Sequence, residues 1–239
     1  MTYGPSLLLD GLIAASAGVL ARRLFGRRFS EQPAGRASRL IEPLAMLSMA
    51  LTAAYLLVGQ PRLRRWGATD EELIQPLPGD ELVPLPAVES TWAVTIDAPA
   101  DAVWPWLAQM GQDRGGFYSY AWLENLAGCQ IRNAESIHPE WQHREINETL
   151  PLHPSAGMPV AVFEPGQALV LDGWGSFVLE PVDEQTTRLI TRTRVPGGWT
   201  ALSYAMLLEI PHFVMQRKML LGIKQRAERS YASQTAARS

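Results

Sequence analysis

The chain has 239 residues, 47% of them hydrophobic, which is enough to bury a full core in one large domain or in one domain with an appendage. The net charge of −3 is uneven, because residues 1–65 carry nine Arg against three acids, a balance of +6, and the rest of the chain therefore carries −9. The acidic main part excludes nucleic acid as a partner, since phosphate binding needs a basic face, and the single Cys129 excludes an internal disulfide or a cysteine-based zinc cluster.

Two apolar runs near the N-terminus predict membrane helices. Residues 43–61 give 19 consecutive uncharged positions, close to the roughly 20 that cross a bilayer, and three Arg and Trp66 follow as interface anchors. Residues 3–25 are also apolar but contain Asp10. We expect residues 1–66 to form a membrane anchor of one or two helices, packed through small residues at four-residue spacing. The alternative is a pair of buried helices in a soluble protein.

The charges around these runs predict retention and orientation of the anchor. Basic residues follow the first run instead of preceding it, the reverse of a cleaved signal peptide. Six Arg lie between the runs, at 22–39, and three follow the second. The positive-inside rule then places the middle stretch in the cytoplasm and the following domain on the extracytoplasmic side.

The first elements of the main domain follow a Pro-rich stretch. Four prolines between Ile74 and Pro86 predict a linker at 67–88. In STWAVTID, at 90–97, apolar and polar residues alternate as in a strand with one buried face. A helix is expected next, with Asp97 as its cap, Pro99 in its first turn and an apolar face of Val103, Trp106, Leu107 and Met110.

The remaining elements are a short helix, a run of strands and a long helix. After a glycine hinge at 115–116, Tyr118, Trp122, Leu123 and Leu126 mark a helix that ends near Gly128. Residues 150–195 consist of short apolar or alternating runs separated by turn residues, which predicts an antiparallel meander. Residues 199–230 are helical in character, and Pro211 is expected to kink this helix or to start its main part.

Three stretches in this order, TIDAPADAVWPWLAQM, GGFYSYAWLENL and FVMQRKMLLGIKQRAE, resemble the SRPBCC superfamily, also called START-like or Bet v 1-like, which includes the polyketide cyclase/dehydrase group. The resemblance covers about residues 89–230. It implies an α+β helix-grip fold, in which a curved antiparallel sheet surrounds a long C-terminal helix and leaves an apolar cavity. We therefore expect a ligand-binding domain at 89–232 and a disordered tail at 233–239, with the anchor outside the shared domain.

Such a cavity would suit an apolar ligand. The aromatic residues near the Gly-rich loop are expected to border its mouth, unless they only fill the core. On the last strand, Arg192 and Arg194 share one face and Thr191 and Thr193 the other, so one pair points inward. Arginines inside would bind an anionic head group, and arginines outside would be solvated. The candidate ligand-binding residues are Trp104, Phe117, Tyr118, Tyr120, Trp122, Trp174, Arg192 and Arg194.

We predict no catalytic residue, metal or cofactor. The chain has no GxSxG, HExxH, GxGxxG or P-loop motif. His138 and His143 are five residues apart, which fits neither one helical face nor a known ligand pattern, so a solvated loop is expected. His212 is a candidate acid or base, but only Glu209 lies near it in sequence, and packing is the favoured interpretation.

The sequence therefore predicts a membrane-tethered domain that binds a hydrophobic small molecule or lipid, with the membrane contacted through the N-terminal helices. One alternative is a cyclase/dehydrase-type enzyme acting on a polyketide-like substrate. Another is an interaction module without ligand. Ligand identity and oligomeric state stay open.

Overall fold

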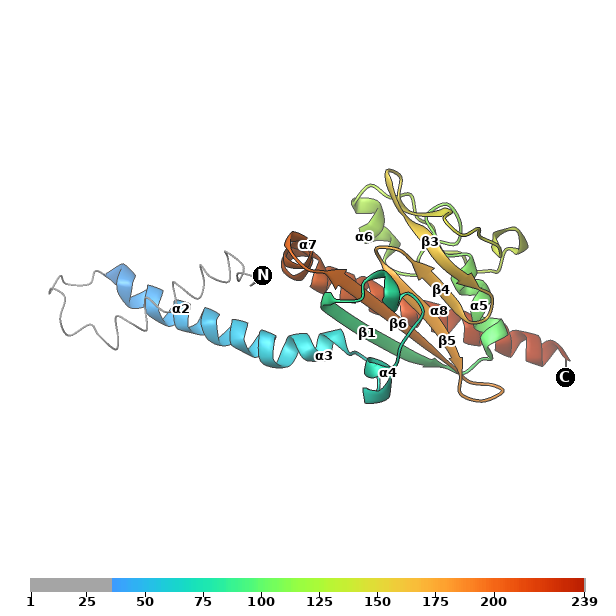
Figure 1. Ribbon diagram of the computed structural model, residues 1–239, viewed down its shortest axis with the longest axis horizontal. Coiled ribbons are helices and arrows are strands. Elements are labelled where there is room, and N and C mark those ends of the chain that lie inside the picture. The colour runs from blue at the N-terminus through green and yellow to red at the C-terminus, as the bar shows by residue number, and fades with distance from the viewer. Residues whose placement is uncertain (1–35, 239) are drawn as a thin grey trace. The chain divides into compact units, whose positions relative to one another are not determined.

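The computed structural model describes residues 36–238, with side chains for residues 44–237 (Figure 1). The chain divides into two compact units, residues 1–63 and 64–239. Helix α2 (Arg36–Ala54) continues through the π-helical turn η1 (Tyr55–Gly59) into α3 (Gln60–Arg64). Among the described residues, the stretch Leu44–Arg64 is long and apolar enough to cross a membrane. The first predicted apolar run, residues 3–25, lies outside the described residues, and the membrane anchor stays a prediction.

The second unit is built on a six-stranded antiparallel sheet in the order β1-β6-β5-β4-β3-β2. Strands β2 to β6 follow one another as hairpins, and β1 adds to the far side of β6, with Trp92 opposite Thr191. This sheet with a long C-terminal helix fits the predicted helix-grip fold (Figure 1). The strands are β1 (Pro86–Ile96), β2 (Thr149–His153), β3 (Ala156–Glu164), β4 (Ala168–Leu171), β5 (Gly175–Pro181) and β6 (Thr187–Pro196).

The helices follow the predicted order with shifted ends. Helix α5 begins after Pro99 and not with an Asp97 cap, because proline already fixes the backbone angle and lacks the amide that a cap would bind. Helical backbone runs without a gap from Trp199 through η4 into α8, and Pro211 lies in the first turn of α8, so it marks the start of the main part of this stretch directly after a π-helical turn. The helices are α4 (Asp70–Ile74), η2 (Asp80–Leu82), α5 (Ala100–Ala108), α6 (Ala121–Leu126), η3 (Pro139–Trp141), α7 (Trp199–Ser203), the π-helical η4 (Tyr204–Leu208) and α8 (Glu209–Arg238).

The core lies between the sheet and helices α5 and α8. Trp92 of β1, Trp106 of α5 and Phe177 of β5 are among its largest fully buried side chains. Leu220 and Ile223 of α8 pack in the same cluster. Burial of each such side chain contributes roughly 1.5–3 kcal/mol, so this cluster holds α8 to the sheet.

The loop expected to be a glycine hinge is a fixed turn. Gly111 and Gly116 exchange two backbone hydrogen bonds of 3.1 and 2.9 Å. The Asn133 side chain accepts from the Tyr118 amide at 2.7 Å and donates to the Ser119 carbonyl at 3.0 Å. These bonds satisfy the loop backbone and hold the aromatic segment against the core.

The Pro-rich stretch, expected to be a linker, packs on the outer face of the sheet. Leu77 is buried against Ala93, Val178 and Ile190. Glu72 of α4 forms a salt bridge of 2.6 Å with Arg188 of β6. The segment is not continuously extended, because it contains the 3-10 turn η2, and its apolar and charged side chains find partners on the sheet.

A candidate ligand cavity

A cavity of about 960 Å³ opens at one end of the sheet, beside the start of α8. Its volume is at the upper end of the roughly 300–1,000 Å³ typical of ligand pockets. Most of its walls are apolar. The lining residues come from the segment before β1 (Leu82, Val83, Pro84, Leu85), from β2, β3 and the β4–β5 turn (Leu152, Met158, Asp172, Gly173, Trp174), from the end of β6 (Thr193, Arg194, Val195, Pro196) and from the C-terminal helices (Thr200, Ser203, Tyr204, Leu208, Pro211, His212, Met215).

Large apolar side chains are exposed at and beside this cavity. Leu85 is 90% exposed and Leu208 54%, and both line the cavity. Trp199, Leu207 and Ile210 each directly precede a cavity-lining residue in the chain, and they are also exposed. We call these five residues the apolar rim. Clustered exposed apolar side chains are typical of surfaces that bind a ligand, a protein or a membrane.

A smaller chamber of about 170 Å³ adjoins the large cavity. The two share Leu152, Trp174, His212 and Met215 as lining residues. The rest of the inner chamber is lined by Phe117, Ser119, Glu124, Ile131, Gln216 and Met219. These four shared side chains therefore form the boundary between the large cavity and the chamber that contains Glu124 and Gln216.

His212 sits at the junction of the two spaces and is neutral. Its Nε2 accepts a hydrogen bond of 3.2 Å from the Trp174 indole, which can only donate. The ring proton is therefore on Nδ1, which donates to the Tyr204 hydroxyl at 2.9 Å. Burial lowers the pKa of His212 to about 4, although the neighbouring Gln216 side chain acts in the opposite direction.

Glu124 brings a carboxyl group to the inner chamber. Its Oε2 is buried, with no hydrogen-bond partner among the described residues. Burial raises the pKa of this carboxyl to about 7. Near neutral pH, the group is therefore close to its titration midpoint, in a chamber whose lining contains no Lys or Arg.

The predicted aromatic residues separate into two groups. Trp174 lines both spaces, and Phe117 lines the inner chamber with its ring 5.4 Å from Trp174. The other four line neither space. Trp104 packs on Phe163, Tyr118 on Trp106, Tyr120 lies under the Lys218 ammonium group, and Trp122 is 68% exposed. A ligand contact by any of the six stays a prediction.

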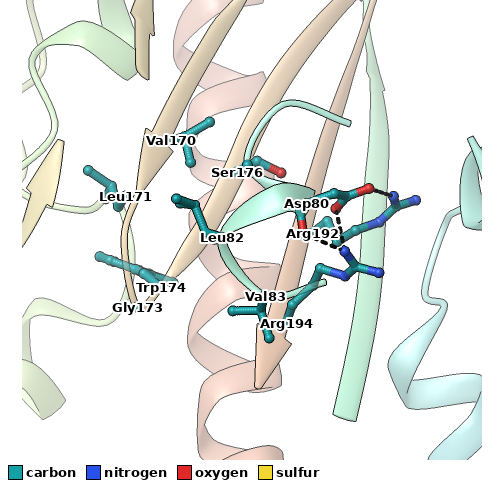
Figure 2. A pocket seen from close by; sticks show the side chains of 12 residues that line it. Asp80, Leu82, Val83, Val170, Leu171, Gly173, Trp174, Ser176, Arg192 and Arg194 are labelled. Atoms are coloured by element: carbon teal, nitrogen blue, oxygen red, sulfur yellow. Dashed lines mark hydrogen bonds and ion pairs between the residues drawn. The ribbon is translucent and has the colours of Figure 1, made fainter. Parts of the chain in front are cut away.

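The two arginines lie on the outer face of the sheet (Figure 2). Arg192 donates to Asp80 at 2.7 Å and to the carbonyl oxygens of Glu72 and Gln75 at 2.6 and 2.8 Å. Arg194 donates to Glu89 and, at the cavity edge, to the Asp80 carbonyl. The pocket beside them holds only about 20 Å³, close to one water molecule.

The inward pair on β6 is therefore formed by the threonines. Thr191 accepts a hydrogen bond from Gln216 of α8 at 3.1 Å, and Thr193 lines the large cavity. Of the two orientations that the sequence leaves open, the structure has the one in which the arginines bind protein groups outside. The guanidinium of Arg192 is thus occupied by groups of the segment before β1. This arrangement does not favour binding of an anionic ligand by Arg192.

Sequence reasoning missed Glu124 and Gln216. Gln216 carries no signal, because a glutamine in a long polar helix is ordinary. Glu124 offers a weak one, since it is the acidic residue in the short helix AWLENL, whose apolar side chains Trp122 and Leu126 are mostly exposed. The orientation of that helix decides which side chain faces the chamber, and periodicity alone does not fix it.

No protein-family model and no curated protein matches the chain. Among solved structures, a conserved protein of unknown function from Enterococcus faecalis matches with a TM-score of 0.37 and 12% identity over 62% of this chain and 85% of the other. A polyketide cyclase-like protein from Corynebacterium glutamicum matches with a TM-score of 0.30 and 15% identity over 57% of this chain and 88% of the other. These similarities are weak, so the description of the fold depends on the topology of the chain itself.

Proposed function

We propose that the second unit binds a hydrophobic small molecule or lipid in the large cavity, and that the N-terminal segment tethers it to a membrane. The observation that carries this proposal is an apolar cavity of about 960 Å³ open to the surface. The apolar rim supports it, because exposed Leu85 and Leu208 give an apolar ligand a path that avoids water.

A melting experiment on the full chain in mild detergent tests the binding. A ligand that binds only the folded state stabilises it by about 2.7 kcal/mol at a hundred times its Kd, so octylbenzene is expected to raise the melting temperature. Absence of a shift with octylbenzene and with every longer apolar compound would contradict the proposal.

The tether and its orientation are part of the proposal. The candidate span Leu44–Arg64 supports a tether, and the arginines at 22–39 favour an extracytoplasmic domain. A Glu184→Cys, Cys129→Ser variant places one reactive thiol on the exposed β5–β6 turn. An impermeant maleimide should label it in intact cells. Labelling only after lysis would place the domain in the cytoplasm.

A cyclase/dehydrase-type enzyme acting on a polyketide-like substrate is the second candidate. It is favoured by Glu124 and His212, two ionisable side chains that line one chamber. Glu124 would be the acid or base, because its pKa of about 7 suits proton transfer at neutral pH. Cyclisation of a linear poly-β-keto thioester by the full chain, abolished by Glu124→Gln, would support this function. A ligand-free interaction module would need no cavity and is not favoured.

A further inference from the structure

The inner chamber is large enough for one ring. Its volume is about 170 Å³, and an apolar protein cavity of about 150 Å³ accommodates benzene. Phe117, Ile131 and Met219 supply apolar walls. The chamber adjoins the large cavity through four shared lining residues, so the proposal takes it as the inner end of one ligand site.

Helix α6 places one carboxyl group, that of Glu124, in the wall of the inner chamber. Its apolar side chains Trp122 and Leu126 are 68% and 77% exposed, whereas Oε2 of Glu124 is buried. Burying a carboxyl oxygen without a hydrogen-bond partner costs free energy. A helix that served only to pack would instead bury Trp122 and Leu126 and expose Glu124. The arrangement is explained if the carboxyl has a ligand to bind.

Gln216 of α8 contributes a second acceptor. Its side chain is buried, and its Nε2 donates to Thr191 Oγ1 at 3.1 Å. Its Oε1 is buried and has no hydrogen bond of normal geometry among the described residues, because both ring nitrogens of the neighbouring His212 are bonded to Trp174 and Tyr204. The chamber therefore contains two acceptor oxygens, Glu124 Oε2 and Gln216 Oε1, whose hydrogen bonds remain to be made.

The other polar side chains of the chamber are already engaged. Both ring nitrogens of His212 are bonded, one to Trp174 and one to Tyr204. Ser119 Oγ donates to the Met215 carbonyl at 3.0 Å. The unpaired polar atoms of the chamber are therefore the Glu124 and Gln216 oxygens, which a ligand can satisfy by donating a hydrogen bond. The carboxyl group and the absence of a basic residue in its lining disfavour an anionic end.

From these contacts we infer that the inner chamber binds a ring hydroxyl, such as a phenol or a cyclic alcohol, at the end of a longer apolar ligand. The hydroxyl donates to Glu124, and a second donor, where the ligand has one, reaches Gln216. The apolar remainder occupies the large cavity. This inference rests on the proposed ligand-binding function and narrows its ligand class.

A pair of probes that differ only in the hydroxyl group tests the inference. para-Octylphenol and octylbenzene are added to the full chain in mild detergent, and the bound fractions are measured by native mass spectrometry. At a pH above the pKa of Glu124, which is about 7, the wild-type chain is expected to bind the phenol about tenfold more tightly, the value of one hydrogen bond to a charged group. Glu124→Leu should abolish this preference and keep octylbenzene binding, and Glu124→Gln, which still accepts, should retain part of it.

The matched control is Glu184→Leu, which removes a carboxylate from an exposed turn and should keep the tenfold preference. Equal binding of the two probes by the wild-type chain would overturn the inference and leave the proposed function intact. A preference that survives Glu124→Leu would also overturn it. Failure of both probes to bind any variant would reject the inference, and absence of a melting shift with every longer apolar compound would reject the proposed function as well.

Discussion

His212 makes the stability of the domain sensitive to acid. Its pKa is about 4 in the folded chain and about 6.5 when exposed, so the unfolded state binds more protons between these values. Stability should therefore fall as the pH falls from about 6.5 to about 4, by up to roughly 3 kcal/mol. A His212→Gln variant lacks this titration. Urea unfolding of both chains at several pH values should show that the free energy of unfolding falls more steeply with acid for the wild type than for the variant. The same pH dependence in both chains would contradict this role of His212.

Glu124 has the opposite effect. Its pKa of about 7 lies above the ordinary value near 4.5, so the folded state binds more protons between them, and stability falls as the pH rises through this window. We expect the free energy of unfolding of Glu124→Gln to equal that of the wild type near pH 4 and to exceed it by about 1–2 kcal/mol near pH 8. This value is reduced because solvent reaches part of the carboxyl group. Thermal unfolding at both pH values measures this, with exposed Glu184→Gln as control. A variant that is weaker at pH 8 would refute the burial of this charge.

Gly222 tests how the aromatic loop meets α8. A Cβ at this position would lie 2.3 Å from the Tyr118 carbonyl oxygen. Helix propensity alone predicts that Gly222→Ala gains about 1 kcal/mol, whereas the clash predicts a net loss of about 1–3 kcal/mol. Urea unfolding decides the sign, and a more stable variant would show that the loop does not pack this closely.

At the scale of elements, Arg192 fastens the segment before β1 to the outer face of the sheet. Its guanidinium is buried and binds Asp80 and three backbone carbonyls. Arg192→Met should cost about 3 kcal/mol, because it leaves these acceptors unpaired. Arg194→Met, at a partly exposed site, should cost about 1 kcal/mol. Hydrogen exchange at residues 70–85 should accelerate most in the first variant, and equal effects would contradict this role.

The elements also show where sequence patterns stop being informative. Alternation on β6 separates Arg192 from Thr191 but does not say which face is inside. That choice depends on two distant segments, Gln216 of α8 and the stretch around Asp80, which cover opposite faces of the strand. Likewise, the prolines at 76–86 predict extended backbone, whereas the segment makes a turn at 78–79 and the 3-10 turn η2, and the burial of Leu77 requires the finished sheet.

For the whole molecule, the order of strands and helices in the main domain could be predicted because hydrophobic periodicity and turn residues are local. The helix-grip arrangement followed from that order and from the resemblance of three stretches. The candidate site could be predicted only in part, since Trp174, Phe117 and Arg194 line the cavities while Glu124 and Gln216 went unnoticed. Their importance arises from burial, which is a property of the folded chain.

The proposed ligand has a long apolar body and a small hydrogen-bonding end. The large cavity accounts for the body, and Glu124 with Gln216 accounts for the end. A membrane would be a natural source of such a molecule, and the candidate span in the first unit is consistent with that source.

Blocking the large cavity tests the central claim most directly. Thr193 is buried and lines this cavity, so Thr193→Trp would fill part of it, whereas Glu184→Trp adds the same ring to an exposed turn. Native mass spectra of the full chains, extracted from membranes in mild detergent, should show a bound apolar molecule on the wild type and on Glu184→Trp but not on Thr193→Trp. No adduct on the wild type, or equal adducts on all three, would contradict ligand binding in this cavity.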